Sequence, residues 1–179
     1  MMDVEILLWK AKRTKTKKTH GFIPSIIFGE HGPAWFTQLF ALMTKQTVFF
    51  LAEDDEDDQL LFREAIAAVD PAISCMVAKN GKEALQILQS DLLISPDCIL
   101  LDLNMPLMNG IDCLRAIKKE PQLLSIPVVL YSTTVTTQME SEAKRLGAVH
   151  IFKKPDNYHG LIDQIRLILA GLDGQVPKQ

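Results

Sequence analysis

Short apolar runs recur along the chain from residue 47 onward, and each is followed by apolar residues at helical spacing. A run without polar alternation predicts a strand that is buried on both faces of a sheet. The predicted strands cover residues 47–52, 73–78, 99–101, 126–131 and 149–152. Apolar residues three or four positions apart predict a helix after every strand, and the last helix ends near Gly171.

Five alternations of strand and helix imply parallel strands joined by right-handed crossovers, with helices on both faces of the sheet. The predicted fold is therefore α/β, a doubly wound five-stranded parallel sheet of the flavodoxin-like type with strand order 2-1-3-4-5. Neither a GxGxxG nor a GxxxxGK(S/T) sequence occurs, so dinucleotide and P-loop nucleotide sites are not expected.

Polar residues mark several predicted helix ends. The acidic residues 55–58 suit a helix N-terminus, where negative charge complements the helix dipole. Thr137 and Glu140 match a capping box, in which Thr137 is the N-cap of the fourth helix. Gly147 suits the C-terminal cap of the same helix.

Residues 1–42 differ from the rest of the chain, because they contain a basic run, KAKRTKTKK, and no sustained apolar period. We interpret them as a disordered or non-native extension, with Met43 as an alternative start; a basic arm or a small partner-binding helix stays open. Residues 43–172 form the predicted domain, and residues 173–179 form a short tail. Prolines and charged residues interrupt the apolar runs of the extension, so neither a membrane span nor a signal peptide is expected.

The net charge of −3 is unevenly distributed, because residues 43–179 carry 19 acidic and 13 basic residues. An acidic body argues against nucleic-acid binding by the predicted domain. The three cysteines lie among apolar neighbours, without CxxC or Cys/His spacing. This pattern argues against a zinc site and favours a reduced, cytoplasmic compartment.

Polar side chains stand at the carboxyl ends of four predicted strands. Glu53 and Asp54 follow the first strand, Asp102 ends the third, Ser132 follows the fourth and Lys154 follows the fifth. In a parallel sheet these ends share the edge at which ligands of open α/β sheets bind. Crowded carboxylates repel one another unless a cation joins them, and oxygen ligands suit Mg²⁺. Three acids, a hydroxyl and a lysine together predict a site that takes up a phosphoryl group on the aspartate of the third strand.

Several motifs occur in a fixed order: Glu53-Asp54, Asp102, the Met-Pro-x-Met-Asn-Gly run at residues 105–110, Ser132, and Lys154-Pro155. On these motifs, residues 46–171 resemble a bacterial response-regulator receiver domain. The acid-rich turn after the first strand makes the chain most similar to the stand-alone, phytochrome-type and phosphorelay receivers.

The resemblance implies a role for each matching acid. Asp102 would accept the phosphoryl group from the phosphohistidine of a sensor histidine kinase or a histidine phosphotransfer protein. Asp54, Asp102 and the backbone carbonyl of Asn104 would hold Mg²⁺, and Glu53 would reach the ion through water.

The resemblance also implies that Ser132 is the switch hydroxyl and that Lys154 pairs with the phosphoryl group. The bond between Lys154 and Pro155 would be cis, as is typical of the family. One position departs from the family pattern: receivers usually carry an aromatic residue three positions before the lysine, and this chain has Ile151 there. Phe152 is expected on the opposite side of the strand.

The expected function is signalling rather than enzymatic catalysis. A single-domain response regulator would pass its state on by protein contact, through residues 137–171, or by onward phosphotransfer; a homodimer stays open. One alternative is a degenerate receiver that acts as an unphosphorylated adaptor, which Ile151 favours. Another is a metal-dependent phosphatase of the haloacid-dehalogenase type, but that class needs a second acid at the position of Asn104.

Overall fold

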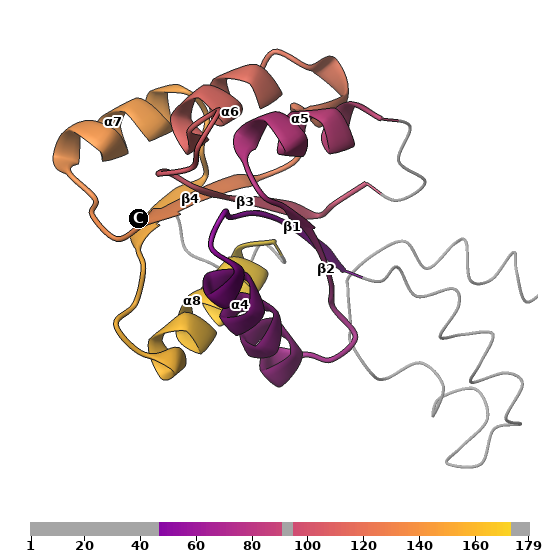
Figure 1. Cartoon of the computed structure of the whole chain (residues 1–179), viewed down its shortest axis with the longest axis vertical. Helices are drawn as coiled ribbons and strands as arrows, with labels where there is room; N and C mark the ends of the chain where they lie inside the picture. The colour runs from indigo at the N-terminus through magenta and orange to yellow at the C-terminus, as the bar shows by residue number, and fades with distance from the viewer. Residues whose placement is uncertain (1–46, 91–94, 173–179) are drawn as a thin grey trace, which may run out of the picture. The chain divides into compact units, whose positions relative to one another are not determined.

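The computed structural model describes residues 47–90 and 95–172, which form a five-stranded sheet with helices on both faces (Figure 1). The strands are β1 (Val48–Ala52), β2 (Ser74–Ala78), β3 (Cys98–Asp102), β4 (Val128–Ser132) and β5 (His150–Lys153). The helices are α4 (Glu56–Val69), α5 (Gly81–Gln89), α6 (Gly110–Ile117), α7 (Thr137–Arg145) and α8 (Tyr158–Leu172), with a short 3-10 helix, η2 (Pro121–Leu123).

Neighbouring strands are parallel throughout, and their order is β2-β1-β3-β4-β5. The predicted doubly wound, flavodoxin-like sheet is therefore confirmed. The extension predicted for residues 1–42 and the tail predicted for residues 173–179 lie outside the described residues.

The central strands are buried along their whole length, because helices cover the sheet on both sides. Every residue of β1, β3 and β4 is buried. Phe50 and Leu101 belong to the core that packs against α5, α6 and α7, whereas Leu51 and Leu100 belong to the core on the α4 and α8 side. This alternation is the ordinary two-residue period of a strand, and it explains why the runs carry apolar residues at every position.

Helix α7 begins one residue earlier than the sequence suggested. Its N-cap is Thr136, whose hydroxyl oxygen accepts a hydrogen bond from the Met139 amide at 3.3 Å. The capping box predicted at Thr137 is wrong, because the third residue after the true cap is Met139, whose thioether lacks the carboxylate or amide oxygen that a capping box uses. The predicted C-terminal cap is confirmed, since Gly147 follows α7 with a φ of 93°.

Helix α4 begins in the acidic run, as predicted. Asp55 is its N-cap, and the Asp55 carboxylate accepts hydrogen bonds from the amides of Asp57 and Asp58 at 2.9 and 3.0 Å. These bonds satisfy amides that have no partner within the helix. The helix start is thereby fixed directly beside the carboxyl end of β1.

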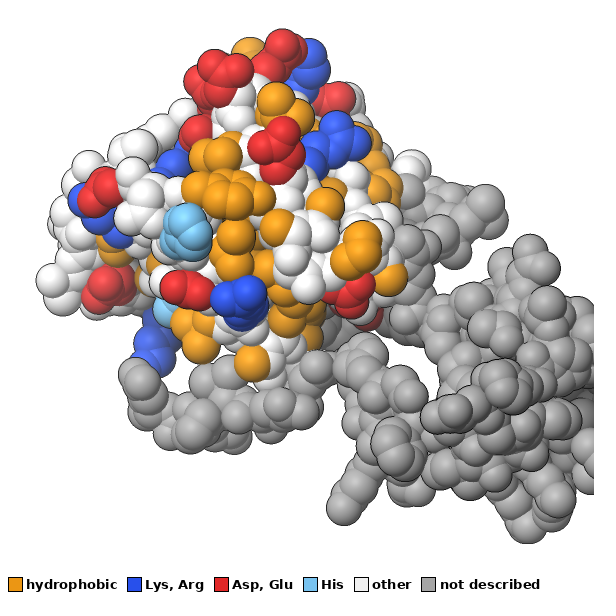
Figure 2. Space-filling view, turned by 90° about the horizontal axis from the view of Figure 1, so that it is seen from below, with side chains coloured by type: hydrophobic (Ala, Val, Ile, Leu, Met, Phe, Trp, Pro, Cys, Tyr) orange, Lys and Arg blue, Asp and Glu red, His pale blue; other side chains and the backbone are white. Residues whose placement is uncertain are grey.

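The face formed by α4 and α8 mixes hydrophobic and charged side chains (Figure 2). Leu60 on α4 is 57% exposed, and Leu167 on α8 is 45% exposed. Among the residues that the structure describes, no helix has both the length and the apolar character needed to cross a membrane.

Candidate functional site

Four strands bring polar side chains to one edge of the sheet. Glu53 and Asp54 directly follow β1, Asp102 and Ser132 are the last residues of β3 and β4, and Lys154 directly follows β5. Because the strands are parallel, these ends lie at the same edge. The structure therefore brings together the side chains that the sequence placed at the ends of separate strands.

Three carboxylates surround the ammonium group of Lys154. Its ammonium nitrogen lies 2.7 Å from Asp58 Oδ2, 2.8 Å from Glu53 Oε2 and 3.1 Å from Asp102 Oδ1. Burial alone would lower the pKa of Lys154, but hydrogen bonds to Asp58 and Glu53 raise it above its ordinary value overall. The ammonium therefore stays protonated and joins the ends of β1, β3 and β5 to the start of α4.

Glu53 is a buried carboxylate whose oxygen atoms have separate partners. Oε2 accepts hydrogen bonds from the Tyr131 hydroxyl at 2.6 Å and from Lys154 at 2.8 Å, and Oε1 accepts one from the Asp55 amide at 3.2 Å. Burial raises the pKa of Glu53 above its ordinary value, although the bonds from Lys154 and Tyr131 oppose that shift. Burial also raises the pKa of Tyr131 well above its ordinary value. The phenol therefore keeps its proton and donates a hydrogen bond to the carboxylate.

Asp102 is held by contacts on both of its carboxylate oxygens. Oδ1 faces Lys154, and Oδ2 accepts a hydrogen bond from the Asn104 amide at 2.6 Å. The Asn104 side chain in turn donates to the Ser132 hydroxyl oxygen at 3.0 Å. Asn104 thus links the ends of β3 and β4, and the Ser132 hydroxyl oxygen already accepts this hydrogen bond.

The turn after β3 approaches Asp102 closely. A Cβ atom at Gly110 would lie 2.3 Å from the Asp102 carbonyl oxygen, so only glycine fits there. Within the turn, the Met108 amide donates to the Pro106 carbonyl at 2.7 Å across Leu107, whose φ is 64°. A three-residue turn of this kind is strained for a residue with a side chain. The tight turn at Leu107 and the close approach of Gly110 to Asp102 together explain the spacing of the Met-Pro-x-Met-Asn-Gly run.

The acids of this edge fit a divalent metal ion. Glu53, Asp54 and Asp102, which we call the acid cluster, each offer a carboxylate oxygen, and these oxygens lie within 4.8 Å of one another. Glu53 and Asp102 are buried, whereas Asp54 is exposed. A set of oxygen donors that opens to solvent on one side suits Mg²⁺, which usually keeps several waters.

The sequence did not reveal two residues that contact the site, Asp58 and Tyr131. The sequence predicts Asp58 only as an acid of a helix N-terminus, but it also pairs with Lys154. It predicts Tyr131 only as an apolar strand residue, but the Tyr131 hydroxyl donates a hydrogen bond to Glu53. A signal for Tyr131 exists in the sequence, because a tyrosine within a buried strand needs a hydrogen-bond partner for its hydroxyl. The pairing of Asp58 has no such signal.

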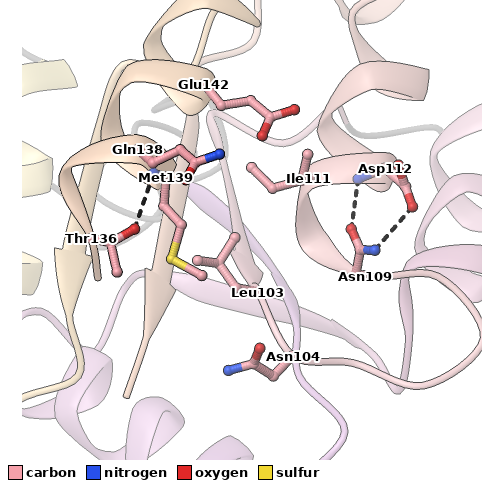
Figure 3. A pocket seen from close by; sticks show the side chains of 9 residues that line it. All are labelled: Leu103, Asn104, Asn109, Ile111, Asp112, Thr136, Gln138, Met139 and Glu142. Carbon is pink, nitrogen blue, oxygen red and sulfur yellow. Dashed lines mark hydrogen bonds between the residues drawn. The ribbon is translucent and has the colours of Figure 1, made fainter. Parts of the chain in front are cut away.

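A pocket of about 450 Å³ lies between α6 and α7 (Figure 3). Apolar side chains of Leu103, Ile111 and Met139 face it, and polar side chains surround them. The complete lining is Leu103, Asn104, Asn109, Ile111, Asp112, Thr136, Gln138, Met139 and Glu142. Only Asn104 is shared with the contacts around Asp102.

The profile of the response regulator receiver domain matches residues 49–166. The chain belongs to this family. The receiver and its structural neighbours are regulators of two-component signalling, and the haloacid-dehalogenase alternative is thereby removed.

The receiver is 42% identical over 106 residues to protein-glutamate methylesterase/protein-glutamine glutaminase 3 of Rhodospirillum rubrum. That match covers 56% of this chain but only 27% of the relative. The chain therefore spans about a quarter of that multidomain relative, and the match concerns its receiver part.

Two solved response regulators show the same fold. The phosphorylated cyanobacterial phytochrome response regulator RcpA is 28% identical, with a TM-score of 0.67, and the match covers 74% of this chain and 98% of RcpA. The Mn²⁺-bound form of response regulator Rcp1 is 26% identical, with a TM-score of 0.63, and the match covers 74% of this chain and 99% of Rcp1.

The last strand of this receiver departs from the family in its aromatic residue. Ile151 packs with the core on the α5, α6 and α7 side, whereas Phe152 is buried in the core on the α4 and α8 side. The predicted placement of the two residues on opposite sides is confirmed. The predicted cis bond before Pro155 is wrong: it is trans, like every peptide bond of the described residues, and trans is the isomer that proline ordinarily favours.

Proposed function

We propose that this receiver accepts a phosphoryl group on Asp102 from the phosphohistidine of a sensor histidine kinase or a histidine phosphotransfer protein. A carboxylate oxygen of Asp102 would attack the phosphorus atom, so that a P–O bond forms, the P–N bond breaks and the imidazole leaves. The observation that carries the proposal is the buried Asp102 carboxylate, 3.1 Å from the Lys154 ammonium at an edge rich in acids. The phosphorylated state named for RcpA supports it.

In this proposal Asp54, Asp102 and the Asn104 carbonyl hold Mg²⁺, and Glu53 contacts the ion through water. The proximity of the three carboxylates supports this assignment, as does the metal-bound form named for Rcp1. When bound, Mg²⁺ would neutralise charge on the transferring group. The residues of the chain would orient Asp102 and exclude most solvent from its carboxylate.

Ser132 and Lys154 would read the phosphorylated state. Lys154 would pair with a phosphoryl oxygen, since its ammonium already lies beside the acceptor carboxylate. The Ser132 hydroxyl would turn to donate to another phosphoryl oxygen and would leave its bond with Asn104. The loop before α7 would then repack.

The proposed output is protein contact through residues 137–171, or onward phosphotransfer. That range includes Val149, which is 63% exposed, and Leu167, which is 45% exposed, so apolar side chains are available to a partner. The matches to RcpA and Rcp1 cover nearly the whole length of those two response regulators. We expect a cytoplasmic protein that binds no nucleic acid through its receiver and is not an enzyme; a homodimer is compatible with this output.

A small phosphodonor with Mg²⁺ tests the proposal directly. We expect a phosphoryl adduct that is stable in acid and labile in base, located on Asp102 by mass spectrometry. Asp102→Asn should abolish the adduct and keep the cooperative unfolding transition, whereas Asp57→Asn, a change of an exposed acid on α4, should keep the adduct. An adduct on another residue would refute the assignment.

The alternative of an unphosphorylated adaptor rests on Ile151, which replaces the usual aromatic residue. It predicts that no adduct forms with any phosphodonor, even though the receiver folds. The same experiment therefore separates the two functions.

A further inference from the structure

Tyr131 contacts the acid cluster through Glu53, but the proposed phosphotransfer assigns no role to this tyrosine. It directly precedes Ser132 on β4, and its side chain is only 3% exposed. Its hydroxyl donates to Glu53 Oε2 at 2.6 Å. Because β3 lies between β1 and β4, this side chain crosses a whole strand to reach the end of β1.

The ring of Tyr131 is fixed on several sides. Its centroid lies 5.9 Å from that of Phe62 on α4 and 5.8 Å from that of Phe152 on β5, and the latter pair is stacked. The Lys154 ammonium lies 4.9 Å from the centroid of the same ring. Packing on both sides leaves the hydroxyl little freedom, so the direction in which it donates is set by the core.

Lys154 alone cannot fix Glu53, because its ammonium is divided between three carboxylates. The Tyr131 hydroxyl is a second donor to the same carboxylate oxygen of Glu53, and it carries no charge. A neutral donor orients the carboxylate while leaving its negative charge for a cation.

We infer that Tyr131 is a positioning residue that sets the affinity of the acid cluster for a divalent cation by holding Glu53. This inference rests on the proposed metal site. The hydrogen bond from Tyr131 to Glu53 connects the core on the α4 and α8 side of the sheet directly to the proposed metal site.

Magnesium titration of the full chain by calorimetry tests the inference. The chain has two tyrosines, so Tyr158→Phe removes the other tyrosine hydroxyl and serves as the reference. Relative to that reference, Tyr131→Phe should bind Mg²⁺ about tenfold more weakly, as loss of an outer-shell partner of a metal site typically does. Equal affinities of the two folded variants would overturn the inference.

A double variant separates this role from a purely structural one. If Tyr131 acts through Glu53, adding Tyr131→Phe to Glu53→Gln should change Mg²⁺ affinity much less than it does in the wild-type chain. A purely structural effect would reduce affinity equally in both backgrounds, and that result would refute the inference.

A spectroscopic readout covers the case in which Tyr131→Phe does not fold. In Tyr158→Phe, Tyr131 is the single remaining tyrosine, so isotope-labelled tyrosine reports on its hydroxyl alone by NMR. We expect the phenol carbon resonance to shift when Mg²⁺ is added, because the carboxylate that accepts its hydrogen bond changes partners. An unchanged resonance with bound Mg²⁺ would overturn the inference, whereas absence of both Mg²⁺ binding and the Asp102 adduct in the wild-type chain would instead refute the proposed function.

Discussion

At the scale of single residues, the edge of the sheet carries more negative charge than its lysine can balance. The carboxylates of Glu53, Asp58 and Asp102 all contact Lys154, and Asp54 joins two of them in the acid cluster. A divalent cation would offset most of the remaining charge. In the proposed function, metal binding and phosphoryl uptake would therefore depend on the same small group of side chains.

Asp58 should contribute to stability through Lys154. Asp58→Asn removes a contact of 2.7 Å, but the carboxylate is 42% exposed, so solvent screening limits the effect. We expect a loss of up to about 1 kcal/mol in the free energy of unfolding, measured by urea denaturation. Asp57→Asn is the matched control, because it removes an acid from the same helix turn without a contact to Lys154. Equal losses in both variants would mean that only the helix dipole matters.

The raised pKa of Glu53 predicts that the stability of the metal-free protein depends on pH. This pKa is raised by burial in the folded state, so the folded chain binds this proton more tightly than the unfolded chain does. Stability from this group is therefore greatest at low pH and falls as the pH rises above about 4.3, the ordinary value for glutamate, through the folded pKa. Denaturation of wild type and Glu53→Gln over a pH series, with a chelator present, should show the wild type losing stability relative to the variant. A constant difference would contradict the shift.

At the scale of elements, neighbouring residues of β4 serve the two sides of the site. Tyr131 packs in the core on the α4 and α8 side, whereas Ser132, the next residue, contacts Asn104 at the end of β3. Helix α7 follows β4 after a short loop and lines the pocket beside Asn104. In the proposed function, a change at the end of β4 would therefore reach the start of α7 over few residues.

The start of α7 can be tested by its cap. Thr136→Ala removes the hydroxyl that accepts from the Met139 amide, so we expect a loss of about 1 kcal/mol in the free energy of unfolding. Thr137→Ala, the matched control, should cost a few tenths of a kcal/mol or less, because alanine suits a first helical position. Urea denaturation measures both variants, and a larger loss at Thr137 would restore the capping box predicted from the sequence.

At the scale of the whole molecule, the pattern of apolar runs was sufficient to predict the fold and the shared edge. Each predicted strand lies within two residues of the observed one, because runs buried on both faces carry few alternatives. The convergence of Asp102 and Lys154 followed from parallel order alone. The contacts of Asp58 and Tyr131 could not be predicted from the sequence. The Asp58 contact depends on where the first turn of α4 lies in space, and the Tyr131 contact depends on a side chain that reaches across β3. The cap of α7 was misplaced because two threonines are adjacent there.

The whole-molecule prediction concerns residues 1–42. The described residues 47–90 and 95–172 supply a five-stranded sheet, two cores and the candidate site. On the prediction that residues 1–42 are an extension, their deletion should leave unfolding and Asp102 phosphorylation unchanged. Denaturation and adduct mass spectrometry of the shortened chain, beside the full chain, measure this. Loss of either property would show that the extension supports the receiver.

Lys154 has one further consequence, which follows from the number of its hydrogen atoms. An ammonium group offers three N–H donors; two of them are hydrogen-bonded to Glu53 and Asp58, and Asp102 forms an ion pair with the same ammonium. A phosphoryl oxygen on Asp102 would compete with the neighbouring carboxylates for this ammonium, and Asp58, at 42% exposure, is the one that water can most easily accept back. Phosphorylation at the end of β3 would then untie the start of α4 from the end of β5. Phosphorylation at the centre of the sheet would thereby weaken the contact between α4 and the end of β5.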